Sequence, residues 1–281
     1  MAVSFSGMRL NDLVIHIFYI PVLIVYAILA LAHFLPAAVG DKLGSYSRWL
    51  AGGGVVIHLG TLVLGALWGE ALPGFPEALS AAALGVMMAY VMISGGTTKV
   101  LGLFLTPIAT VLLGTSLVVP SRQIVAMEGV GVSPWLPIHL GLIFAGLGGF
   151  ALAFAVGCAY LFVRNRLKKK KLTRLVKFPS LELLDRIQFR ATLSGFIFLT
   201  LGIGAGGAWA AVSLAKAWTW DPKVFFPLVI WAWYGLALQL RLVRGWRGRW
   251  AALFSIVGFC GVVFSLVVFN FIYSGWHAYA P

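Results

Sequence analysis

The sequence predicts an all-α integral membrane protein, a bundle of eight transmembrane helices that forms a single domain over residues 1–281. Of its residues, 61% are hydrophobic and only 10% are charged, whereas a soluble domain carries about 25% charged residues. Its apolar runs repeatedly reach the length of about 20 residues that a helix needs to cross a bilayer. The runs are too long for the strands of a membrane barrel and do not alternate, so the spans must be helices.

We expect the spans, in chain order, at residues 12–35, 49–68, 77–95, 99–119, 135–164, 190–214, 224–243 and 249–273. The first run is too long for the apolar region of a signal peptide, so it is interpreted as a span. Proline falls inside three spans, at Pro21, Pro107 and Pro227, where each removes a backbone donor.

Two further features concern the inner ends and the packing of these spans. Residues 179–190 indicate a short amphipathic helix on the inner surface, although Leu181, Leu184, Ile187 and Gln188 do not separate cleanly into an apolar and a polar face. The glycine-rich stretches 146–157 and 202–208 place small residues where two membrane helices can approach closely.

The net charge of +13 indicates membrane orientation rather than nucleic-acid binding, because lysine and arginine gather in cytoplasmic loops. If the segments 164–177 and 241–249 are cytoplasmic, 17 of the 21 basic residues lie inside. Both termini and the segment 215–223 are then extracytoplasmic, and 165–189 forms a basic cytoplasmic loop. This loop can also hold anionic lipid head groups or a soluble partner.

The segment AKAWTWDPK, residues 215–223, interrupts two apolar stretches on the outer side. Trp218, Trp220 and Asp221 lie there, in the same layer as His139 at the start of the fifth span and His277 after the eighth. Flat aromatic surface between two imidazoles suits haem, since neutral imidazole ligates haem iron. Tryptophan also belongs at the membrane interface as an anchor, so both readings stay open.

Five pieces of the chain, over residues 49–281 and in the same order, are similar to the WWD-domain family of haem-handling cytochrome c assembly proteins, the CcsA and HemX branch. They are LPGFPEAL (72–79), WLPIHLGLIFAGLGGFALA (135–153), the stretch 179–210, AWTWDPK (217–223) and GWHAY (275–279).

The resemblance implies haem b held at the outer face, with His139 and His277 as the axial ligands of the iron. Trp218, Trp220 and Asp221, with Trp209 upstream, form the platform of this implied site. His58 matches a membrane histidine of the family, and Arg190 matches a basic residue that can guide haem propionates. Both also have ordinary interpretations: His58 can hydrogen-bond across helices, and Arg190 can reach the head groups.

The sequence departs from the family pattern at four positions. Leu214 and Ala215 replace a Trp-Gly pair, Val224 replaces the closing glutamate of the WWD segment, and Gln239 stands where the family has an inner histidine. Amide side chains are poor iron ligands, so the departure at Gln239 argues against an inner haem site that uses this position.

Two functions follow from the resemblance, and both place the chain in the bacterial cytoplasmic membrane. In the CcsA branch haem is transported or delivered to apocytochrome c with a CcsB-like membrane partner. In the HemX branch the protein regulates haem biosynthesis through glutamyl-tRNA reductase. The outer carboxylates are scattered along the chain, so we expect no catalytic residues and a transport, chaperone or regulatory role rather than an enzyme. A place in a cytochrome c haem lyase complex stays open.

Overall fold

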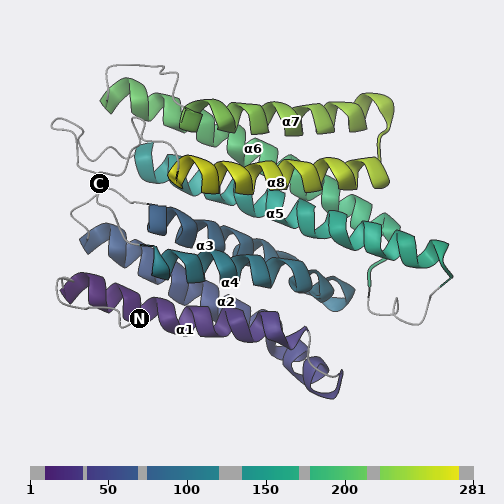
Figure 1. The fold of residues 1–281 in the computed structure, drawn as a ribbon, viewed down its shortest axis with the longest axis horizontal. Helices are drawn as coiled ribbons and strands as arrows, with labels where there is room; N and C mark the ends of the chain where they lie inside the picture. The colour runs from purple at the N-terminus through teal and green to yellow at the C-terminus, as the bar shows by residue number, and fades with distance from the viewer. Residues whose placement is uncertain are drawn as a thin grey trace.

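The computed structural model describes residues 10–33, 37–68, 75–119, 135–170, 178–213 and 222–271. Every regular element within these ranges is a helix, as the sequence predicts. The elements are α1 (Leu10–Ala32), α2 (Ala37–Trp68), α3 (Phe75–Ile93), the short 3₁₀ helix η1 (Gly96–Leu101), α4 (Gly102–Val118), α5 (Trp135–Lys168), α6 (Leu181–Ser213), α7 (Pro222–Arg244) and α8 (Arg249–Phe271). They lie side by side as one bundle (Figure 1).

Seven helices in the described part of the chain are long and apolar enough to cross a membrane, so the chain is a multi-pass membrane protein. The first helix contributes a shorter apolar stretch, Phe18–Ala32, and its role as an eighth span stays a prediction. Most helix bounds agree with the expected spans, but α2 begins at Ala37 rather than at residue 49. The three prolines lie inside α1, α4 and α7, as expected.

The sequence predicts a separate amphipathic helix at 179–190. This prediction is wrong, because α6 runs without a break from Leu181 to Ser213. Ser180 caps its first turn, where its hydroxyl accepts a hydrogen bond from the backbone N–H of Leu183 at 3.2 Å. No proline or glycine interrupts the next three turns, so nothing in the backbone separates the polar first turns from the apolar helix that follows. The basic segment 165–189 is therefore helical at both ends, since α5 continues to Lys168.

Helix α5 is the central element, because it packs against α3, α6 and α8. Figure 1 shows α1 to α4 on one side of it and α6 to α8 on the other. Glycines allow backbones to meet on both sides. A Cβ atom at Gly85 of α3 would collide with the carbonyl oxygen of Phe144, and one at Gly149 of α5 would lie 2.8 Å from the Cα of Gly195 in α6. The expected close approach of helices at 146–157 is thus confirmed.

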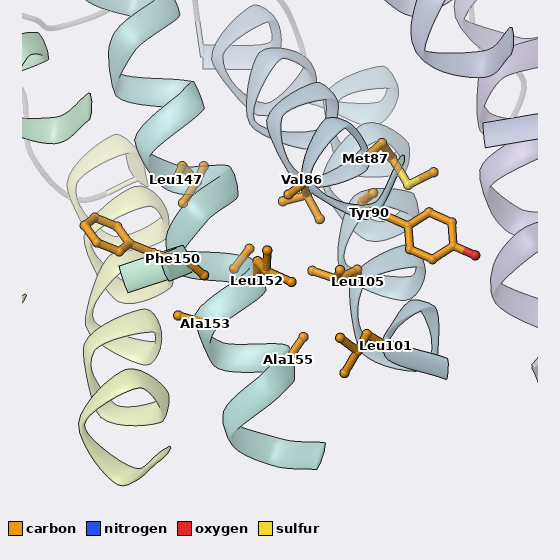
Figure 2. Close-up of a cluster of buried hydrophobic side chains, with 14 of the residues drawn as sticks. Val86, Met87, Tyr90, Leu101, Leu105, Leu147, Phe150, Leu152, Ala153 and Ala155 are labelled. Carbon is orange, nitrogen blue, oxygen red and sulfur yellow. The ribbon is translucent and has the colours of Figure 1, made fainter. Parts of the chain in front are cut away.

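The buried core lies where α3, α4 and α5 meet (Figure 2). Met87 and Tyr90 of α3, Leu105 of α4, and Ala151 of α5 are fully buried there. On the opposite face of α5, Phe150 stacks on Tyr234 of α7 with ring centroids 3.7 Å apart and planes inclined by 5°. The core thereby fixes α5 relative to both halves of the bundle.

The two basic segments gather at one end of the bundle. There α5 ends, α6 begins, and the turn from α7 to α8 lies beside them (Figure 1). The opposite end holds the start of α5 at Trp135, the last turns of α6 around Trp209, and the start of α7 at Pro222. The fold thus separates the basic end from the end that carries His139.

Candidate functional site

His139 lies in the second turn of α5 and is fixed by α6. Its Nδ1 is 2.7 Å from the carbonyl oxygen of Gly202. A carbonyl oxygen can only accept, so Nδ1 carries the hydrogen and the neutral ring has its lone pair on Nε2. A histidine that ligates a metal is commonly oriented by such a hydrogen bond from its other ring nitrogen to a backbone carbonyl.

Gly206 makes room for the ring of His139 against α6. A Cβ atom at this position would lie 2.7 Å from Nδ1 and 2.8 Å from Cε1 of the imidazole. One turn earlier, a Cβ atom at Gly202 would lie 2.8 Å from Cδ1 of Ile143 on α5. The close approach expected at 202–208 is confirmed, and here it serves to seat a histidine side chain.

Trp209 lies three residues after Gly206, so it is on the same face of α6, one turn nearer the helix end. Its indole Nε1 is buried and has no hydrogen-bond acceptor among the residues that the structure describes. A buried donor without a partner costs about 1–3 kcal/mol. The indole N–H is therefore suited to a ligand that brings an acceptor to this end of the bundle.

His58 has a different setting, because its partners lie on α1 and α3. The ring is fully buried, with Nδ1 3.1 Å from the hydroxyl of Tyr26 and Nε2 2.8 Å from Oγ of Ser80. The ring of Tyr19 meets it edge-on at 5.6 Å. This geometry favours the interpretation of His58 as a hydrogen-bonding residue across helices, and a role in haem handling stays a prediction.

The remaining candidate residues are not brought to His139 within the described ranges. Arg190 is exposed on α6, twelve residues before Gly202, which corresponds to about 18 Å along the helix axis. His277, Trp218, Trp220 and Asp221 lie outside the described residues. Their predicted roles are therefore not tested by this geometry.

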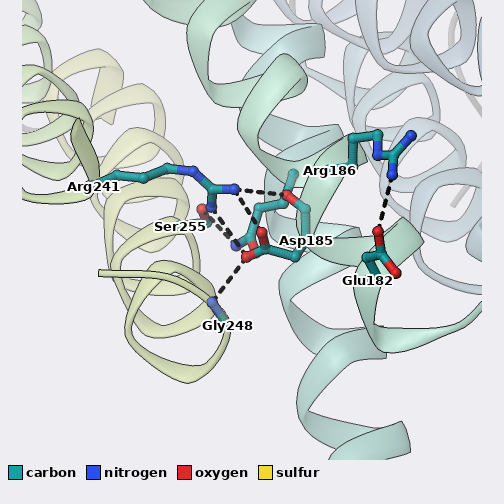
Figure 3. Close-up of polar contacts among 7 residues, drawn as sticks. Glu182, Asp185, Arg186, Arg241, Gly248 and Ser255 are labelled. Carbon is teal, nitrogen blue, oxygen red and sulfur yellow. Dashed lines mark hydrogen bonds and ion pairs between the residues drawn. The ribbon is translucent and has the colours of Figure 1, made fainter. Parts of the chain in front are cut away.

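A polar cluster at the basic end was missed by the sequence reasoning (Figure 3). The guanidinium of Arg241, at the end of α7, donates to both carboxylate oxygens of Asp185 on α6, at 2.6 and 3.1 Å. The backbone N–H of Gly248 donates to the same carboxylate at 2.8 Å, and the guanidinium lies over the ring of Phe189 at 4.7 Å. The sequence offered one signal for this ion pair: an acidic residue lies where one span begins, and an arginine lies where the next span ends.

Comparisons with known proteins agree on one family. The family model described as cytochrome C assembly protein matches residues 72–277. Among curated proteins, the chain is 29% identical to a cytochrome c biogenesis protein CcsA from Prochlorococcus marinus strain MIT 9515, over 52% of this chain and 54% of that protein. It is 32% identical to the protein of the same name from strain MIT 9215, over 51% of this chain and 43% of that protein. The chain spans about half the length of these curated relatives.

Proposed function

Because the chain belongs to the cytochrome c assembly protein family, we propose that it binds haem at the outer membrane face and holds it for transport or delivery to apocytochrome c. Haem is the cargo in this proposal, in the form of haem b, and His139 and His277 are its axial ligands. The observation that carries the proposal is the hydrogen bond from Nδ1 of His139 to the carbonyl oxygen of Gly202, since it fixes the ring tautomer in which Nε2 carries the lone pair that iron needs.

The described residues at this end fit such a cargo. Gly206 lets the imidazole lie close against α6. Trp209 supplies a buried N–H that finds no acceptor within the described ranges, which suits the carboxylate of a haem propionate. The segment 215–223, with Trp218, Trp220 and Asp221, would form the aromatic platform. The seven residues from Phe271 to His277 span at most about 21 Å, so His277 can return from the end of α8 toward His139.

The proposal includes a topology of eight spans with both termini extracytoplasmic. The fold supports it, because the segments 164–170 and 241–249 lie at one end of the bundle and His139 at the other (Figure 1). Placing the basic end in the cytoplasm follows the charge rule for membrane proteins. Haem would then meet an extracytoplasmic apocytochrome c, with the help of a CcsB-like membrane partner, in a bacterial cytoplasmic membrane.

Optical spectra of the protein purified in detergent test the ligand assignment. We expect a bis-imidazole haem b spectrum from the wild type and lower haem occupancy in His139→Ala and in His277→Ala. His16→Ala, which changes a histidine of α1, is the control and should keep full occupancy. Added imidazole should restore the spectrum of a His139→Gly variant. Unchanged occupancy in both single alanine variants would overturn the assignment.

A second candidate is a HemX-like regulator that binds glutamyl-tRNA reductase. The exposed arginines at the basic end, Arg244, Arg247 and Arg249, favour an acidic cytoplasmic partner there. Recovery of that enzyme with detergent-solubilised wild type, and its loss when these three arginines are changed to glutamine, would support regulation. Recovery of apocytochrome c with the haem-loaded protein would support delivery instead.

A further inference from the structure

Gln188, in the second turn of α6, has an incomplete set of hydrogen bonds. Gln188 is only 1% exposed. Its Nε2 donates to Oγ of Ser255 on α8 at 3.0 Å, whereas its Oε1 is buried without a donor from the described part of the chain. Turning the amide over would move the deficit to the nitrogen and would not remove it. This buried amide lines a space between helices.

That space is a small, partly open cavity between α6, α7 and α8. Its polar lining consists of Gln188, Thr192, Arg241 and Ser255, and the rest is apolar. About 20 Å³ is available to the centre of a water-sized ligand, and one water molecule needs roughly 10–15 Å³ by this measure. The cavity thus admits one molecule of the size of water.

The charges around the cavity select the class of ligand. The guanidinium of Arg241 lines it and opposes a sodium or ammonium ion. The unpaired Oε1 of Gln188 accepts hydrogen bonds and opposes an anion. A neutral molecule that both donates and accepts satisfies both residues, and water is the one that fits.

We propose that this cavity binds a single structural water, which donates a hydrogen bond to Gln188 and accepts one from Arg241 or Thr192. The water joins two groups that the direct contacts leave separate: the pair of Gln188 with Ser255, and the ion pair of Arg241 with Asp185. With this water, the two pairs form one polar network that ties α6, α7 and α8 at the basic end. Figure 3 shows the direct contact between Arg241 and Asp185.

Hydroxyl-radical labelling by X-ray radiolysis in lipid nanodiscs, read by mass spectrometry, tests this water. Leu238 lines the cavity and is 7% exposed, so labelling there reports water held inside rather than bulk solvent. We expect labelling of Leu238 in the wild type and its fall to background in Gln188→Met, which keeps the side-chain length but has no amide. Gln239→Met, at an exposed position of α7, is the matched control and should keep the labelling.

Two results would overturn the proposal. An unlabelled Leu238 in the folded wild type would mean that the cavity is dry. Labelling that persists in folded Gln188→Met would mean that the amide does not hold the water. If Gln188→Met does not fold, a wild-type cryo-EM map that resolves ordered waters elsewhere in the bundle decides the question by the presence or absence of density beside Oε1 of Gln188.

Discussion

Replacing Trp209 by phenylalanine separates the indole N–H from the aromatic ring that carries it. In the haem-loaded protein we propose that this N–H donates to a propionate. A hydrogen bond to a charged group contributes about 1.5–3 kcal/mol, and each 1.4 kcal/mol corresponds to a tenfold change in affinity. Haem binding should therefore weaken by about 10- to 150-fold.

The protein without haem should respond differently. The substitution removes a buried donor that has no acceptor among the described residues, which relieves about 1–3 kcal/mol. It also removes some buried aromatic area, an opposing effect of similar size. The free energy of unfolding without haem should thus change by less than about 1 kcal/mol.

The assay is a titration of the haem-free protein with haem and, separately, with haem dimethyl ester, which lacks free carboxylates. Trp209→Phe should weaken binding of haem and leave binding of the ester close to the wild-type value. Equal weakening for both ligands would assign the effect to ring shape, and no weakening for either would place the propionates elsewhere. Failure of the wild type to bind haem would instead refute the proposed function itself.

Two further predictions concern packing and charge. Gly206→Ala would place a Cβ atom 2.7 Å from the imidazole of His139, so we expect about 1–3 kcal/mol of destabilisation and lower haem occupancy, measured by thermal unfolding and optical spectra. Gly207→Ala is its control, since no atom of the described residues lies within 4 Å of a Cβ there, and loss of stability in both variants would contradict the argument. Asp185→Asn leaves Arg241 without its counter-charge in a site where both side chains are less than one-fifth exposed, so unfolding in SDS should become easier by about 2–4 kcal/mol. Glu182→Gln breaks the exposed pair with Arg186 and should change stability by less than about 0.5 kcal/mol; similar effects of the two would refute the role assigned to burial.

Much of the fold could be predicted because bilayer thickness sets helix length. Apolar runs of about 20 residues located most helix bounds to within a few residues, and the small residues of 146–157 and 202–208 located close helix contacts. The start of α6 could not be predicted in this way. The mixture of apolar and polar residues at 179–190 indicated a surface helix. In the structure Arg241 pairs with the carboxylate of Asp185, 56 residues earlier, and no local pattern reveals such a partner.

The candidate site was predictable in its residue types and much less in its hydrogen bonds. An imidazole at the start of a span is visible in the sequence at His139, but its acceptor is a backbone carbonyl on another helix, at Gly202. The hydrogen bond of Gln188 could not be predicted from the sequence either. The sequence shows only that Gln188 fits an amphipathic pattern poorly, whereas its burial against Ser255 depends on how α6 and α8 pack.

The contact between α3 and α5 restricts how this bundle can move. The main chains of α3 and α5 touch at Gly85 and Gly148, with no side chain between them. Rotation of either helix about its axis would bring a residue larger than glycine into this contact. This contact therefore joins the group α1 to α4 to the group α5 to α8 by direct backbone packing. A flat ligand that binds at His139, as we propose, would need displacement of a helix at the edge of the bundle. Helix α7 is such a helix, because its backbone packs on α6 and α8 and it reaches α5 through the stacking of Tyr234 on Phe150.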